Sequence, residues 1–258
     1  MSQSRITLRP DSLHDTGGVL SSSLTVALVT GAIGWYLVQE AVWQPYHLVV
    51  SIISFLVLAS LVNLLWILRP GGSRFGEANQ ATLLRSGLVC LIGSALLASG
   101  QSTDVSWHLS GLIALALALD GVDGILARRL NLTSAFGARF DMEVDALLLL
   151  ILSLLVWQTG QAGAWVLAIG LMRYAFVLAS WFCPRLAAPL RPSFRRKTVC
   201  ALQGIALLAC LLPPLDQTAT SVIAMAALAT LTMSFGLDIR VLLLGSPAIR
   251  HVKEGPET

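Results

Sequence analysis

The sequence predicts an all-α integral membrane protein, a polytopic helical bundle of about eight transmembrane helices. Only 12% of its 258 residues are charged and 55% are hydrophobic, whereas ordinary soluble domains carry roughly 25% charged residues. Long stretches also lack Asp, Glu, Lys and Arg altogether, and about 20 apolar residues suffice to cross a bilayer. These stretches should be helical because lipid leaves each backbone polar group to be satisfied within the segment. Composition therefore excludes a water-soluble globule.

The expected spans follow from the positions of the few charges. In chain order they are 18–38, 46–68, 82–100, 106–128, 138–158, 162–183, 198–213 and 218–236. The first two spans and the last two contain no charged residue. The third carries Arg85 near its start, and the sixth is interrupted by Arg173. The fourth carries acids in its second half, and the fifth carries acids in its first half.

The cations alternate between the breaks that separate these spans. Lys and Arg occur in both tails and in breaks 69–81, 128–140 and 184–197, but not in 39–46, 100–105, 158–163 or 213–218. Under the positive-inside rule this alternation predicts that both termini are cytoplasmic. Three glycines in the 69–81 break indicate a boundary there. We expect a tail with two accessory helices in 1–70, a six-helix unit in 71–245 and a cytoplasmic tail in 246–258.

Two pairs of aspartates occur at membrane depth. Asp120 and Asp123 are spaced i, i+3 and Asp141 and Asp145 are spaced i, i+4, so each pair shares one face of its helix. Acids at this depth are expensive and are functional candidates by default. Both pairs should lie at the same cytoplasmic level, where four carboxylates would repel one another without a cation. Their oxygen-only ligand set favours Mg²⁺ or Mn²⁺.

Small and basic residues beside the aspartates indicate a phosphate ligand. Gly124 and Gly137 would let a ligand approach the backbone closely, and Arg128 is suited to binding a phosphate with two hydrogen bonds. Glu143 points away from the face of Asp141 and Asp145 at 100° per residue, so we leave it out of the site. The residues together predict a diphosphate held on metal ions at the cytoplasmic surface.

The full motif resembles the signature of the CDP-alcohol phosphotransferase family (CDP-alcohol phosphatidyltransferases, class I). It reads Asp120-x2-Asp123-Gly124-x2-Ala127-Arg128-x8-Gly137-x3-Asp141-x3-Asp145, with no gap or substitution. Asn79-x2-Thr82-x2-Arg85 is similar to a motif that opens many members. Arg173 and Arg196-Lys197 are similar to basic positions of phosphatidylglycerophosphate synthase-like members. That branch usually has Pro between its last two aspartates and Lys after them, where this chain has Asp141-Met-Glu-Val-Asp145-Ala146.

The resemblance implies an enzyme of phospholipid biosynthesis in a membrane, here a bacterial inner membrane with the active site cytoplasmic. Its reaction transfers a substituted phosphate from a CDP-linked lipid donor, CDP-diacylglycerol first, to a small alcohol such as glycerol 3-phosphate and releases CMP. Two Mg²⁺ or Mn²⁺ ions would be held by the aspartates, with Asp145 as general base. Gly124, Ala127, Arg128, Gly137, Asn79 and Thr82 would bind the nucleotide, and Arg173, Arg196 and Lys197 would bind the acceptor. The resemblance is also compatible with a homodimer, and no nucleic-acid partner is expected.

Other readings of the same residues stay open. Within the family, the acceptor could be inositol, serine or a choline-type alcohol, or a CDP-alcohol could donate to diacylglycerol. From another class, a cation or proton transporter would also carry acids within the membrane. A transporter favours a midplane site and inverted repeats, whereas these acids are expected at the cytoplasmic edge.

Overall fold

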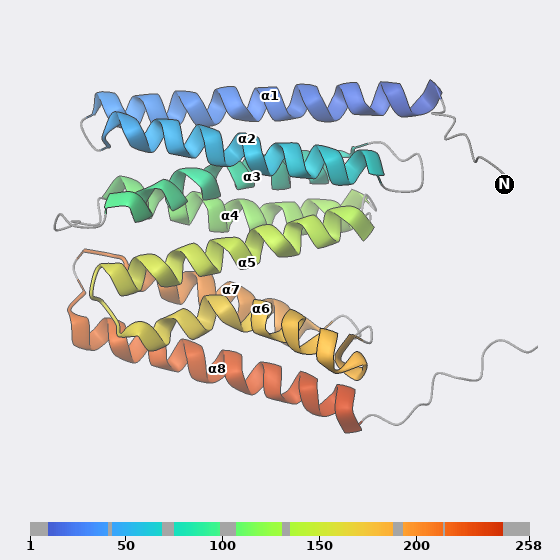
Figure 1. Ribbon diagram of the computed structural model, residues 1–258. Coiled ribbons are helices and arrows are strands. Elements are labelled where there is room, and N and C mark those ends of the chain that lie inside the picture. The colour runs from blue at the N-terminus through green and yellow to red at the C-terminus, as the bar shows by residue number, and fades with distance from the viewer. Residues whose placement is uncertain are drawn as a thin grey trace, which may run out of the picture.

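Eight α-helices form a layered bundle in the computed structural model, which describes residues 10–40, 43–68, 75–98, 107–130, 135–187, 193–213 and 215–244. Successive helices run in opposite directions (Figure 1). Their bounds are α1 Pro10–Gln39, α2 Pro45–Leu68, α3 Glu77–Ser94, α4 Trp107–Leu130, α5 Ala135–Gln158, α6 Leu167–Phe182, α7 Phe194–Cys210 and α8 Gln217–Leu244. Short 3-10 helices, η1 Ala95–Ala98, η2 Ala164–Val166 and η3 Pro184–Ala187, extend or join them.

The predicted fold class is confirmed, since each expected span overlaps one helix. Within the part of the chain that the structure describes, five segments are long and apolar enough to cross a membrane: Gly17–Gln39, Pro45–Leu68, Asn79–Leu97, Ala164–Phe182 and Gln217–Leu243. The other three helices are α4 and α5, which carry the aspartates, and α7, which is 17 residues long. Several helices continue beyond the predicted spans, α8 as far as Leu244. The charge pattern locates the hydrocarbon core, whereas a helix can continue into the polar interface.

Helices α3 and α5 form the centre of the bundle. The α1–α2 pair packs on one side of α3, while α6 and α7 pack against α5 and α8 packs on α7. On α3, Leu83, Leu91 and Ile92 are fully buried. The outer faces of α2 and α8 instead expose Leu, Val, Ile and Met side chains, as expected for helices that contact lipid.

The accessory pair packs closely against the six-helix unit. A Cβ atom at Gly87 on α3 would lie 2.4 Å from the Thr30 hydroxyl on α1, so these two backbones approach as only small residues permit. At the end of α2, the buried Trp66 ring makes edge contacts with Phe75 and with Phe136 at the start of α5, with ring centroids 5.0 and 5.1 Å apart. The division at residue 70 stays a prediction, but these contacts tie α1 and α2 to the helices that carry the site.

Candidate active site

The candidate site lies in the half of the bundle where α3 begins, α4 ends and α5 begins (Figure 1), inside the helices rather than at their ends. Asp120 comes from the second half of α4. Asp141 and Asp145 come from the first half of α5, one turn apart on the same face. Arg85 comes from α3, which packs against both α4 and α5. Four charged side chains from three helices therefore meet within the bundle.

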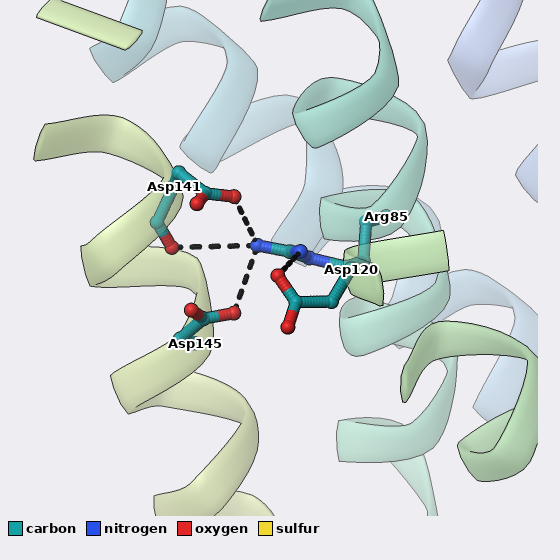
Figure 2. Close-up of polar contacts among 4 residues, drawn as sticks. All are labelled: Arg85, Asp120, Asp141 and Asp145. Atoms are coloured by element: carbon teal, nitrogen blue, oxygen red, sulfur yellow. Dashed lines mark hydrogen bonds and ion pairs between the residues drawn. The ribbon is translucent and has the colours of Figure 1, made fainter. Parts of the chain in front are cut away.

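The Arg85 guanidinium lies between the aspartates (Figure 2). Its Nη1 donates to Asp120 Oδ1 at 2.6 Å. Its Nη2 donates to Asp141 Oδ1 at 2.6 Å and lies 2.9 Å from Asp145 Oδ1. A longer contact of 3.4 Å joins Nη2 to the backbone carbonyl oxygen of Asp141. One buried cation thus links α4 to α5.

The arginine and the three aspartates of these ion pairs differ in how far they are buried. The Arg85 side chain is 0% exposed, whereas the side chains of Asp120, Asp141 and Asp145 are 39%, 42% and 26% exposed. Water screens a buried pair poorly, so each charge needs a close partner. Among the described side chains, one guanidinium faces three carboxylates, and the negative charge that remains favours a further cation.

The aspartate oxygens are spaced suitably for a divalent ion. One carboxylate oxygen from each of Asp120, Asp141 and Asp145 can be chosen so that all lie within 4.8 Å of one another. Opposite ligands of a Mg²⁺ ion, each about 2.1 Å from it, are about 4.2 Å apart. Neighbouring ligands are only about 3.0 Å apart, so the three oxygens would have to move closer together to bind one ion. Carboxylate oxygens are the ligands that Mg²⁺ and Mn²⁺ prefer.

Several predicted site residues lie close to this cluster along the chain. Asn79 and Thr82 precede Arg85 on α3, and both are buried at 4% exposure. Gly137 lies one turn before Asp141 on α5 and is half-buried. The predicted residues Asp123, Gly124, Ala127 and Arg128 belong to α4, but their side chains lie outside the described residues.

The predicted acceptor-binding residues come from α6 and α7. Arg173 on α6 pairs with Glu143 on α5, and its Nη1 also lies 2.8 Å from the Met142 sulfur. Glu143 therefore has a partner on α6, and its exclusion from the site stays a prediction. In the first turn of α7, Arg196 is half-buried and Lys197 is exposed.

Two residues, Arg85 and Asp238, form ion pairs that the sequence does not predict. The motif assigns Arg85 no role, yet Arg85 lies at the centre of the cluster. The sequence signal for it is an arginine within a predicted span, which is costly without a partner. Asp238 on α8 pairs with Arg195 on α7 at 2.5 Å, and its side chain is only 13% exposed. The reason is packing, because α7 and α8 bring these residues together across 43 positions of sequence.

Fold and site define a class: a polytopic helical membrane protein with a cluster of aspartates inside its bundle. The family model of CDP-alcohol phosphatidyltransferases matches residues 76–233, more than half of the chain. The chain therefore belongs to the CDP-alcohol phosphatidyltransferase family. No match is found among curated proteins or among solved structures. Membership implies a membrane enzyme of phospholipid synthesis that acts on a CDP-linked substrate and an alcohol and uses divalent metal.

Proposed function

We propose that this protein transfers the phosphatidyl group of CDP-diacylglycerol to an alcohol, foremost glycerol 3-phosphate, and releases CMP on the cytoplasmic side of a bacterial inner membrane. The observation that carries the proposal is the convergence of Asp120, Asp141 and Asp145 within the bundle. At that depth the lipid tails of donor and product stay beside the apolar helices while the head group reacts among the polar side chains.

Divalent metal fits the donor set of this site. Asp120, Asp123, Asp141 and Asp145 would hold two Mg²⁺ or Mn²⁺ ions. When bound, such ions neutralise the diphosphate and stabilise the leaving CMP, as in two-metal phosphoryl transfer. This proposal depends on the negative charge that Arg85 alone leaves uncompensated.

The protein's own residues would position the substrates and move one proton. Asp145 would accept the proton of the acceptor hydroxyl, since it is the least exposed of the three aspartates and a carboxylate within hydrogen-bond reach can act as general base. Gly124, Ala127 and Gly137 have small side chains or none, so they would let the nucleotide approach the helix backbone. Arg128 would bind a phosphate. Asn79 and Thr82 would form hydrogen bonds with the cytidine part of the donor.

Basic residues favour an acceptor that carries its own phosphate. Arg173, Arg196 and Lys197 lie on the two helices that pack against α5 and α8. Arg173 already has Glu143 as its partner, so an acceptor phosphate would have to replace that carboxylate. Inositol, serine or choline-type acceptors would not need this exchange, and a CDP-alcohol donor with diacylglycerol would not either.

The decisive experiment measures CMP release by the purified full-length protein with Mg²⁺ or Mn²⁺. CDP-diacylglycerol and soluble CDP-alcohols serve as donors against a panel of alcohols and diacylglycerol, and the lipid product is identified by mass. We expect release only with metal and with glycerol 3-phosphate, and we expect Asp145→Asn to abolish it. Asp216→Asn, an exposed acid at the opposite end of the bundle, is the matched control.

Two other outcomes would change the assignment. Release with another acceptor would keep the reaction class and replace the acceptor. No metal-dependent release across the whole panel would contradict the proposed reaction and leave ion transport as the alternative.

A further inference from the structure

A buried cation already occupies the space between the three aspartates. The Nη1 atom of Arg85 lies 2.6 Å from an oxygen of Asp120, and its Nη2 atom lies 2.6 and 2.9 Å from oxygens of Asp141 and Asp145. These are the carboxylates whose oxygens could also converge on a metal ion. The guanidinium and the ion therefore compete for the same negative charge, and in part for the same space.

We propose that Arg85 is an internal counter-ion that holds the metal-free site together and is displaced from the aspartates when a divalent ion binds. The inference rests on the metal site of the proposed function. It assigns Arg85 a positioning role: in the absence of metal the guanidinium keeps α4 and α5 in register.

Charge gives the first reason for this exchange. With Arg85 removed, three carboxylates from two helices would face one another without a described cation between them, and like charges at this distance repel strongly in a poorly screened interior. A fully buried arginine likewise cannot stay unpaired. Each side therefore stabilises the other in the metal-free protein, which explains why α3 presents a cation at this depth.

Geometry gives the second reason. A Mg²⁺ ion must lie about 2.1 Å from its oxygens, whereas the guanidinium nitrogens lie 2.6 to 2.9 Å from the Oδ1 atoms of the three aspartates. An ion bound by those oxygens would stand next to a positive nitrogen with no anion between them. The repulsion favours release of the guanidinium over shared occupancy.

The hydrogen bonds of Arg85 give the third reason. Its Nε atom is buried and has no hydrogen-bond partner among the described residues. A buried donor without a partner costs free energy. The guanidinium is thus held by its two ends but is not fully satisfied in this position, which lowers the cost of leaving it.

Binding of Mn²⁺ to the purified full-length protein tests the proposal without using activity. The concentration of free Mn²⁺ is followed by electron paramagnetic resonance for the wild type, Arg85→Gln and Arg85→Lys. Arg195→Gln is the matched control, because it removes a half-buried arginine paired with an aspartate outside the cluster. We expect Arg85→Gln to bind Mn²⁺ about tenfold more tightly, a change of ~1.4 kcal/mol, and Arg195→Gln to leave the Kd unchanged.

Thermal melting supplies an independent measurement on the same samples. Arg85→Gln should melt at a lower temperature than the wild type in chelator, because the aspartates lose their counter-ion. It should gain more from added Mn²⁺ than the wild type does, because the stabilisation by a ligand, RT ln(1 + [L]/Kd), rises as Kd falls. Arg195→Gln should gain as much as the wild type.

The lysine variant keeps the test usable if Arg85→Gln does not fold. A single ammonium offers one nitrogen in place of the planar fork, so it should compete less well and tighten Mn²⁺ binding about threefold. Equal or weaker binding by the Arg85 variants, with binding by the wild type intact, would overturn the displacement and indicate that the ion binds the second carboxylate oxygens beside Arg85. No Mn²⁺ binding by the wild type would overturn the metal site itself, and this inference with it.

Discussion

Asp141 and Glu143 stand two residues apart on α5 with different partners. Asp141 meets Arg85 inside the cluster, whereas Glu143 pairs with Arg173 and its side chain is 57% exposed. We expect Asp141→Asn to lower Mn²⁺ affinity at least about 100-fold, because even partners of metal ligands cost 10- to 100-fold. Glu143→Gln should stay within about threefold of the wild type. Titration of both variants with Mn²⁺ checks this, and equal losses would show that Glu143 belongs to the metal site.

At this scale the sequence predicts helix faces well and partners between helices poorly. Spacings of three and four residues place Asp141 and Asp145 together, because an α-helix returns to the same face after about 3.6 residues. Nothing local relates them to Arg85, which is 56 positions from Asp141. That contact depends on how α3 packs between α4 and α5. The same limit applies to Arg195 and Asp238.

Between elements, close packing of α5 and α6 depends on Gly170. A Cβ atom there would lie 2.5 Å from the Leu150 Cα atom and 2.5 Å from the Ser153 hydroxyl. Because backbone cannot move aside cheaply, we expect Gly170→Ala to cost about 1–3 kcal/mol. Gly236→Ala on α8 meets nothing within 4 Å and should be neutral or stabilising by up to about 1 kcal/mol. Thermal melting in detergent compares them, and similar melting temperatures would show that α6 can shift away from α5.

The end of α2 should matter to the stability of the six-helix unit. Trp66 is 5% exposed and its ring contacts both Phe75 and Phe136. Replacement by alanine leaves a cavity at the start of α5, so we expect Trp66→Ala to lose about 3–5 kcal/mol. Trp181→Ala is the control, because that ring is 76% exposed on the outer face of α6. If both variants melt alike, the accessory pair does not support α5.

For the whole molecule, the membrane itself explains why a few charges sufficed to predict eight helices. Hydrocarbon requires an apolar, helical segment at each crossing, so the charge-free stretches predict the order and approximate length of the spans. They do not predict which helices are neighbours. Placement of α3 and α5 at the centre depends on which faces bury small residues such as Gly87 and Gly170, and composition alone does not reveal those faces.

The orientation of the whole bundle is the last expectation to test. Helix α1 begins and α8 ends at the end of the bundle that carries the aspartate cluster (Figure 1). The described cations Arg139, Arg185 and Lys197 are exposed near the ends of helices on that side, while the described turn 159–163 at the other end has none. The positive-inside rule therefore predicts a cytoplasmic site.

Reporter fusions in a bacterial host measure this directly. A fluorescent protein fused after Thr258 should fold and fluoresce in the cytoplasm, and alkaline phosphatase fused after Gln161 should be exported and active. Exchanging the two reporters supplies the control, because each should then be inactive. The opposite pattern would place the aspartates on the outer side of the membrane, and the orientation would then contradict the positive-inside rule.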